Sequence, residues 1–224
     1  MKTAESSGRN PITKPYILHE SYPFLLVCAV LFGGLLYAGY PEAAIVPLVL
    51  GLYFAYFFRC PKRKIPYDEN ILVSPADGTV MDVSDDVDED QFLGEKCHRI
   101  TIFLSVFNVH TNRAPMAGKI SFMSYIEGRF RPAYESSVGY ENERGAMGIT
   151  GKKRSILVVQ IAGLLARRVV LWRNLGEDIK QGELYGMIKF GSCTELYVPG
   201  NVEIYVKKGD KVTGGTTVIG RLTE

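Results

Sequence analysis

The chain opens with a long apolar region and then changes to short apolar runs separated by turn residues. Between Tyr22 and Phe58 the only charged residue is Glu42, and the apolar run breaks around it. Two stretches remain, at about 22–39 and 43–58, and both are apolar on every face, which is untypical of a surface helix. As helices they would be roughly 27 and 24 Å long, close to the ~30 Å core of a bilayer. We therefore predict a transmembrane helical hairpin.

The charges that flank the hairpin predict its orientation. Lys14 precedes it, and Arg59 and the basic run Lys62–Lys64 follow it. Because basic flanks stay on the cytoplasmic side, both ends of the hairpin are expected there, in the cell (inner) membrane. The basic cluster is either a pure topology signal or a contact for anionic headgroups. The domains are thus an N-terminal cytoplasmic segment at 1–21, the hairpin at 22–58 and a globular part at 59–224.

The globular part is predicted to be rich in β-strands. Alternating or continuous apolar runs between turn residues indicate strands. We predict them at Ile71–Val83, Arg99–Phe107, Gly118–Tyr125, Ser155–Ile161, Arg167–Leu171, Leu184–Phe190, Glu195–Val198 and Val202–Val206. The acidic stretch Asp85–Asp90 is interpreted as a hairpin tip. Arg129–Gly151 has little periodicity and is interpreted as a long, functional loop.

Bulk composition narrows the function classes. The 224 residues carry a formal net charge of +2, which argues against nucleic-acid binding as the main role. The four cysteines lack metal or redox spacing and are interpreted as reduced thiols. The three histidines, His19, His98 and His110, are too scattered to suggest a metal site.

Three segments carry the candidate chemistry. They are Ser74-Pro75-Ala76-Asp77-Gly78-Thr79-Val80, Phe103 to Pro115 with His110 inside it, and Phe190-Gly191-Ser192-Cys193. Taken singly, Asp-Gly and Gly-Ser are common turn pairs. In this order and these frames they resemble the phosphatidylserine decarboxylase family, in its short form, from about Arg59 to the end of the chain.

The resemblance implies that the chain cuts itself between Gly191 and Ser192. The Ser192 hydroxyl would attack the Gly191 carbonyl to form an ester, and loss of the Ser192 α-proton would then expel the Gly191 carboxylate. The remaining dehydroalanine hydrolyses to a covalent pyruvoyl group, the implied cofactor. His110 is the implied base and Asp77 the group that orients it. The products are residues 1–191 and a small chain, 192–224, that stays as partner.

Further residues enter through the same resemblance. Asn142, Glu143 and Arg144 resemble a motif placed near the active site, where Glu143 and Arg144 would pair or Arg144 would meet the substrate's phosphate or carboxylate. A fragment that starts near Lys62 is expected to retain self-cleavage, because Asp77, His110 and Ser192 all follow it.

Two motifs depart from patterns of the family. Longer forms carry His-x-x-His-x-Pro, whereas Arg113 stands here in place of the second histidine. Their cleavage motif is usually Leu-Gly-Ser-Thr, and here it is Phe-Gly-Ser-Cys. Cys193 is interpreted as a small packed side chain.

The segments 73–83 and 206–220 resemble the opening strand and closing hairpin of lipoyl and biotinyl domains. The expected fold is therefore mostly β: a flattened barrel or sandwich related to those hybrid barrels, with the N-terminal transmembrane hairpin. The expected function is decarboxylation of phosphatidylserine, a membrane phospholipid. A homodimer is the candidate assembly. The alternatives are an archaetidylserine decarboxylase that acts on ether lipids and a non-enzymatic, membrane-anchored hybrid-barrel module.

Overall fold

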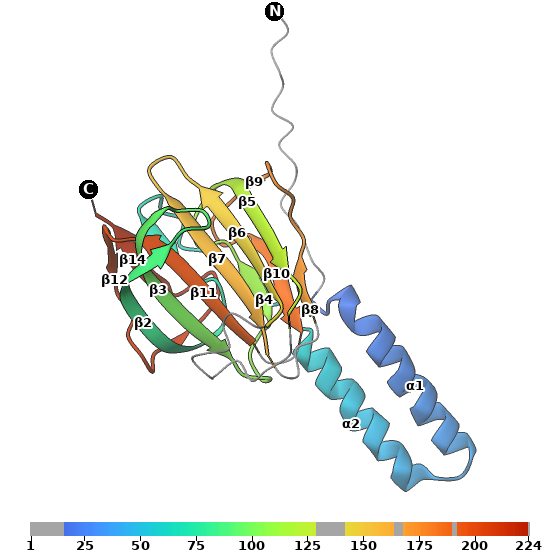
Figure 1. The fold of residues 1–224 in the computed structure, drawn as a ribbon. Coiled ribbons are helices and arrows are strands. Elements are labelled where there is room, and N and C mark those ends of the chain that lie inside the picture. Colours follow the sequence, from blue (N-terminus) through green and yellow to red (C-terminus); the bar gives the residue numbers. More distant parts are fainter. Residues whose placement is uncertain (1–15, 129–141, 164–167, 190–191, 224) are drawn as a thin grey trace, which may run out of the picture.

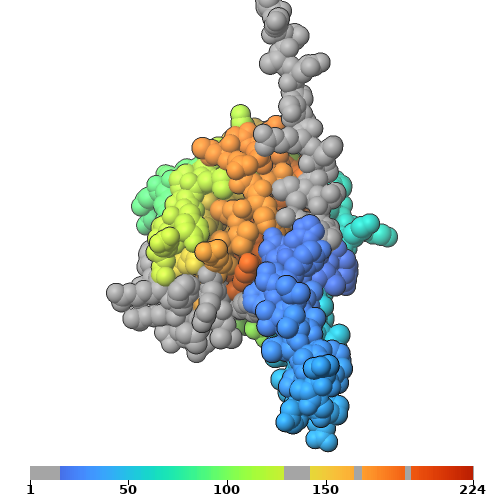
Figure 2. Space-filling model, turned by 90° about the vertical axis from the view of Figure 1, so that its right-hand side faces the viewer, coloured from blue at the N-terminus to red at the C-terminus, as the bar shows by residue number. Residues whose placement is uncertain are grey.

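The computed structural model describes residues 16–128, 142–163, 168–189 and 192–223. Its outline is a β-domain from which two antiparallel helices project as a stalk (Figures 1 and 2). The short 3₁₀ helix η1 (His19–Ser21) leads into α1 (Tyr22–Tyr37), and α2 (Pro41–Phe57) returns to the β-domain. Gly39 adopts φ +80° in the connection, a conformation that favours glycine. The two helices lie within the predicted hairpin.

The hairpin presents apolar side chains to its surroundings. Residues His19–Tyr37 form a helical segment long and apolar enough to cross a membrane, whereas α2 is a shorter apolar helix. Leu26 and Val30 on α1 and Leu52 on α2 are each about two-thirds exposed, at 66%, 64% and 64%. An exposed apolar surface of this kind is typical of contact with lipid or with another protein.

Within the described residues, the strands of the β-domain form three antiparallel sheets. The eight-stranded sheet has the order β13-β2-β3-β11-β7-β6-β5-β9 and curls into a half-barrel, and two three-stranded sheets have the orders β1-β14-β12 and β4-β10-β8. The strand bounds are β1 Ile71–Val73, β2 Gly78–Glu89, β3 Glu95–Leu104, β4 Thr111–Arg113, β5 Gly118–Ile126, β6 Arg144–Thr150, β7 Ser155–Ala162, β8 Arg168–Leu171, β9 Asp178–Ile179, β10 Leu184–Lys189, β11 Ser192–Pro199, β12 Val202–Ile204, β13 Lys211–Val212 and β14 Val218–Leu222.

The main core lies between the curled sheet and the β1-β14-β12 sheet. Its fully buried side chains include Leu72, Ile100, Ile102, Leu196 and Ile219. Burial of each such side chain contributes roughly 1.5–3 kcal/mol relative to exposure. The core therefore holds β3 and β11, the two strands that reach the predicted cleavage region, in fixed register.

A second apolar cluster joins the helices to the β-domain. This junction cluster consists of Leu18, Phe57, Phe58, Cys60, Leu184 and Met187. The chain on either side of the hairpin is also paired, since Leu18 N donates to Phe58 O at 3.0 Å and Ile17 bridges Arg59. Because Leu184 and Met187 belong to β10, the base of the hairpin is packed directly on the sheet that leads to residue 191.

The structure corrects three sequence predictions. Ile71–Val83 is two strands rather than one, because residues 74–77 leave the sheet between β1 and β2. Asp85–Asp90 is not a hairpin tip, since β2 continues to Glu89. The prediction of a loop at Arg129–Gly151 is wrong for its last part, because Arg144–Thr150 forms β6, which lies between β5 and β7. Residues 129–141 lie outside the described residues.

Candidate active site

The predicted cleavage site lies where the chain passes from one sheet to another. β10 ends at Lys189, and β11 begins at Ser192 in the middle of the curled sheet. Ser192 pairs with Leu104 on β3 and with Ala162 on β7. Gly191 lies outside the described residues. The start of β11 is therefore fixed from both sides by neighbouring strands.

His110 is held close to this connection by backbone pairing. It immediately precedes β4, which pairs with β10, and Ile188 N donates to His110 O at 3.1 Å. Ile188 is three positions before Gly191 in the chain. The structure thus brings together the regions of His110 and Ser192, which are more than eighty residues apart in sequence.

The His110 ring is buried and in contact with the helical hairpin. Its side chain is fully buried, and its ring centroid lies 4.2 Å from that of Phe57 at the end of α2. Burial is the main cause that lowers the pKa of His110 to about 4; the hydrogen bond to the Asn108 carbonyl opposes this shift and the Arg59 charge adds to it. The imidazole is therefore neutral at physiological pH.

The hydrogen bonding of His110 fixes which nitrogen carries the proton. Nδ1 lies 3.0 Å from the Asn108 carbonyl oxygen, which can only accept, so Nδ1 carries the hydrogen. Nε2 is then the basic nitrogen, and it is buried without a hydrogen-bond partner among the described residues. A neutral, unpartnered imidazole nitrogen beside the cleavage region has the form required of a general base.

Asp77 belongs to a segment hydrogen bonded to the His110 segment, but its carboxylate binds other groups. Its Oδ2 accepts from Arg63 Nη2 at 2.8 Å, and its Oδ1 accepts from Gly214 N at 2.8 Å. Arg113, three residues after His110, donates from its backbone N to Pro75 O at 2.9 Å. The two segments are thus adjacent, but within the described part of the chain His110 makes no hydrogen bond to Asp77. A role for Asp77 in orienting His110 stays a prediction.

A buried polar network joins the segment that follows His110 to the strand that begins at Ser192. Asn112 donates to Thr194 Oγ1 at 3.1 Å, and Gln160 donates to Asn112 Oδ1 at 2.7 Å. All three side chains are fully buried. Asn112 follows His110 by two residues, and Thr194 follows Ser192 by two. The network therefore sets the position of the His110 strand relative to β11 and β7, and a mispaired amide here would be costly.

Asn142 and Glu143 lie at the same end of the curled sheet. Asn142 Nδ2 donates to Ala162 O at 2.8 Å, and Ala162 N donates to Glu143 O at 2.9 Å. Ala162 is the residue paired with Ser192. Asn142 therefore supports the strand end beside the cleavage region.

The carboxylate of Glu143 is also committed to the protein. It accepts from Tyr125 Oη at 2.6 Å and from Val169 N at 3.0 Å. The bond to Glu143 is the main reason that the pKa of Tyr125 rises to about 12. Arg144, the first residue of β6, is paired in register with Ile126 and Ile161.

Cys193 is packed in a small apolar cluster with Ala146, Leu157, Val159 and Ile161. Burial is the main cause that raises the pKa of its thiol to about 12. The thiol is therefore protonated at neutral pH, which argues against a nucleophilic role.

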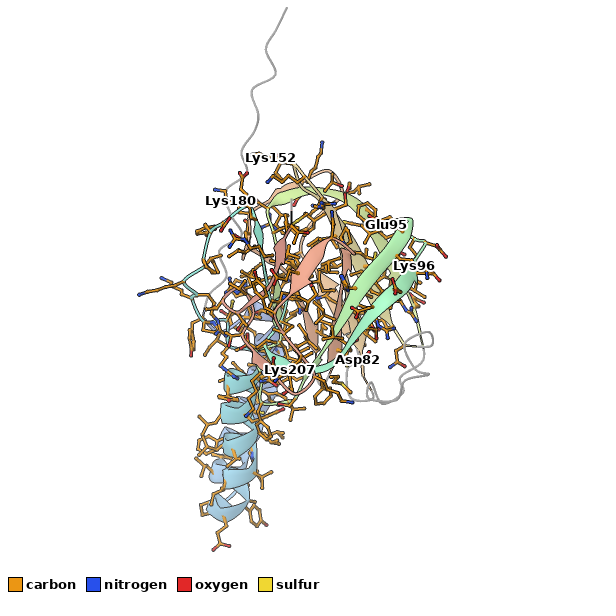
Figure 3. The ribbon with its side chains drawn as sticks, turned by 90° about the vertical axis from the view of Figure 1, so that its left-hand side faces the viewer. Asp82, Glu95, Lys96, Lys152, Lys180 and Lys207 are labelled. Atoms are coloured by element: carbon orange, nitrogen blue, oxygen red, sulfur yellow. The ribbon has the colours of Figure 1, made fainter. Side chains whose placement is uncertain are left out.

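A cavity lies at a distance from this region. Its volume is about 680 Å³, and its lining includes Lys119, Lys152 and Lys180. Lys152 and Lys180 lie at the end of the β-domain farthest from the helical hairpin (Figure 3). Lys119 and Thr150 pair at one end of β5 and β6, whereas Ile126 and Arg144 pair at the other, beside the cleavage region. The cavity and the His110 region thus lie at opposite ends of the sheet.

Sequence reasoning missed several residues around His110. Phe57, Arg63, Asn112 and Gln160 each contact a predicted site residue or the strand that carries it. One of them left a signal: Gln160 is a polar amide within the apolar run of Ile156–Ala162. A buried amide in such a run needs a partner, which points to a polar network.

Comparison with known proteins identifies the family. The model of the family described as phosphatidylserine decarboxylase matches residues 50–220. The chain belongs to this family. It is 42% identical over 212 residues to the phosphatidylserine decarboxylase proenzyme of Symbiobacterium thermophilum, covering 94% of this chain and 98% of that protein. The proenzyme of Carboxydothermus hydrogenoformans is 49% identical over 175 residues, which are 78% of this chain and 82% of that protein.

The family match extends further toward the N-terminus than the sequence motifs suggested. It begins inside α2, so it includes the last turn of that helix with Phe57. This is the turn that packs on His110. The relatives are named proenzymes, which denotes precursors that require processing.

Proposed function

We propose that this protein is a membrane-anchored phosphatidylserine decarboxylase that generates its own pyruvoyl group by cleavage between Gly191 and Ser192. One observation carries the proposal beyond the family comparison. The neutral His110 presents an unpartnered Nε2 in a buried setting, and its carbonyl is hydrogen bonded to Ile188, three residues before Gly191. This arrangement supports a base that serves the cleavage reaction.

In the proposed cleavage, His110 Nε2 accepts the Ser192 hydroxyl proton as the oxygen attacks the Gly191 carbonyl. The backbone of β11, paired on both sides, holds Ser192 while the chain before it is released. Asp77 binds Arg63 and the Gly214 amide, and these bonds fix the segment of residues 74–77. This segment in turn holds the His110 segment and so orients the base. A positioned general base contributes roughly 10²- to 10⁴-fold in rate.

The residues present fit a pyruvoyl group at position 192. Once formed, this group supplies an electron-accepting carbonyl for loss of CO₂ from the serine headgroup. Cys193, the next residue, is packed in an apolar cluster, and neutral His110 can later hold and return a proton. Asn142 and Glu143 keep the end of β7 in place on the substrate side, and Arg144 provides a positive charge at the same end.

The hairpin is proposed to insert in the cell membrane with the β-domain on the cytoplasmic side. The exposed apolar residues of α1 and α2 support insertion, and the basic residues after α2 support the orientation. The β-domain is further proposed to be related to lipoyl and biotinyl hybrid barrels. Pairing of Lys211 with Thr79 and of Val212 with Gly78, which joins the opening and closing segments, supports that relation. Assembly as a homodimer stays a prediction.

The test combines processing with activity in purified, detergent-solubilised protein. We expect conversion of phosphatidylserine to the ethanolamine lipid with release of CO₂. His110→Gln should slow self-cleavage by at least ~100-fold, and Asp77→Asn should slow it less. His98→Gln is the matched control, because His98 lies on β3 paired with Asp85 and away from the cleavage region. Normal cleavage in His110→Gln would remove His110 from the proposed role.

A further inference from the structure

Arg59 occupies an unusual position at the end of α2. Its guanidinium carbon lies 3.7 Å from the centroid of the Tyr56 ring. Nη1 donates to Tyr56 O at 2.8 Å, and Nη2 donates to Phe107 O at 2.8 Å. Stacking on an aromatic face and bonding to two carbonyls hold the group in one orientation. Because a guanidinium has five N–H groups, these two bonds leave donors available for a ligand.

Arg59 lies between the apolar helix α2 and the region of His110. It follows the apolar helix α2 by two residues, so it lies where the hydrocarbon region would end. Phe107, which accepts its hydrogen bond, is 64% exposed and is three residues before His110. Tyr56 Oη donates to the same Phe107 carbonyl at 3.1 Å. Tyrosine and arginine beside an apolar helix are typical of the level of lipid headgroups.

Arg59 is also close enough to His110 for its charge to act on that ring. Phe57 packs against the same ring, so the last turn of α2 forms one wall of the proposed active site. A serine phospholipid whose headgroup reaches the His110 region would pass its phosphodiester near this wall, since its acyl chains stay in the bilayer beside the hairpin.

The substrate carries two anions, and the chemistry distinguishes between them. A fixed cation on the serine carboxylate would stabilise the ground state that must lose CO₂, and so would oppose the reaction. The phosphodiester keeps its charge throughout and can be held without this cost. We infer that Arg59 binds the phosphodiester of the serine phospholipid and thereby positions the headgroup at the reacting centre. This inference rests on the proposed function.

The test separates binding of phosphate from other roles of Arg59. The full-length protein and the variants Arg59→Gln, Arg59→Lys and Lys62→Gln are assayed on dispersed short-chain phosphatidylserine. A second substrate is an O-alkyl serine of similar chain length, which lacks the phosphate. Lys62 is exposed and nearby, so its variant removes an equal charge as the matched control. Denaturing gels report self-cleavage of each protein.

We expect Arg59→Gln to self-cleave and to raise KM for the phospholipid roughly 10- to 100-fold, the effect of one or two charge-assisted hydrogen bonds. Its kcat/KM for the phosphate-free substrate should change less than about threefold, because that substrate never used the bonds. Arg59→Lys keeps the charge and should recover most of the loss. Lys62→Gln should leave both substrates unchanged.

Three results would overturn the inference. One is an equal loss on both substrates in Arg59→Gln, which would assign the residue a structural role. Another is an equal rise in KM for Lys62→Gln, which would indicate a general surface charge effect. The third is failure of both Arg59 variants to self-cleave, which would assign the residue to folding or processing. Absence of activity in the unaltered protein would instead contradict the proposed function itself.

Discussion

Acidification should destabilise the uncleaved protein through His110. In the folded chain burial lowers the pKa of this imidazole to about 4, whereas an unfolded chain restores the ordinary value of 6.5. Between these values the unfolded state binds a proton that the folded state excludes. The free energy of unfolding is therefore at its full value above pH 6.5 and falls as the pH drops toward 4.

The size of the effect follows from the two pKa values. A difference of two to three pH units corresponds to roughly 3 kcal/mol. Small domains are stable by only about 5–15 kcal/mol, so a loss of this size is readily measured. The fully buried position of His110 and its contact with Phe57 leave little solvent to screen the charge.

The assay uses the Ser192→Ala protein, which should remain a single chain, in detergent. Its free energy of unfolding is measured by chemical denaturation between pH 7.5 and 4.5 and compared with that of the double variant Ser192→Ala/His110→Gln. Glutamine does not titrate, so the double variant should lose about 3 kcal/mol less over this range. Carboxylates titrate in both proteins, and their contribution cancels in the difference.

Parallel pH dependences in the two proteins would refute the argument, because they would show that His110 titrates alike when folded and unfolded. The same pKa also predicts that self-cleavage of the unaltered chain is independent of pH above about 5 and declines near pH 4. A decline centred at pH 6.5 would likewise contradict burial of a neutral imidazole.

Three further predictions concern the fold that supports the site. Gly148→Ala should destabilise the chain by roughly 1–3 kcal/mol, measured by denaturation, since the added Cβ would lie 2.6 Å from the Phe92 ring. Asn112→Ala should cost about 1–3 kcal/mol and slow self-cleavage, because it leaves buried polar partners unpaired. A fragment that starts at Lys62 should cleave poorly on gels and aggregate, because it lacks Phe57, which packs on the His110 ring.

The last of these reverses the expectation drawn from sequence. In sequence, the hairpin and the globular part meet at about residue 59, and all the predicted reactive residues follow that point. In the structure Phe57 and Phe58 are fully buried in the junction cluster with Leu184 and Met187. The end of the hairpin therefore forms part of the proposed site. Contacts between distant segments leave no local periodicity, so sequence could not reveal them.

The sequence was informative where one physical signal was strong. All-round apolarity located the two helices, and alternation located strands such as β5 and β12. It failed at β6, whose Gly145 and Gly148 obscure the pattern. A Cβ on Gly145 would lie 2.9 Å from Val169, so these glycines are required by close packing rather than by a loop.

The candidate site was likewise predicted only in part from the sequence. Motif resemblance drew attention to Asp77, His110 and Ser192, and the structure places their segments side by side. The hydrogen-bond partners of these segments could not be predicted in the same way. Arg63 binds Asp77, and Asn112 is hydrogen bonded to Gln160 and Thr194. These hydrogen bonds depend on the registers of strands far apart in sequence, and those registers are set by the packed core.

The most direct test of the account is the intact mass of the purified protein. We predict two chains, residues 1–191 with an ordinary carboxyl end and residues 192–224 with a pyruvoyl group in place of the serine amine. Ser192→Ala should give one full-length chain without decarboxylase activity. A single full-length chain that decarboxylates phosphatidylserine would contradict the account.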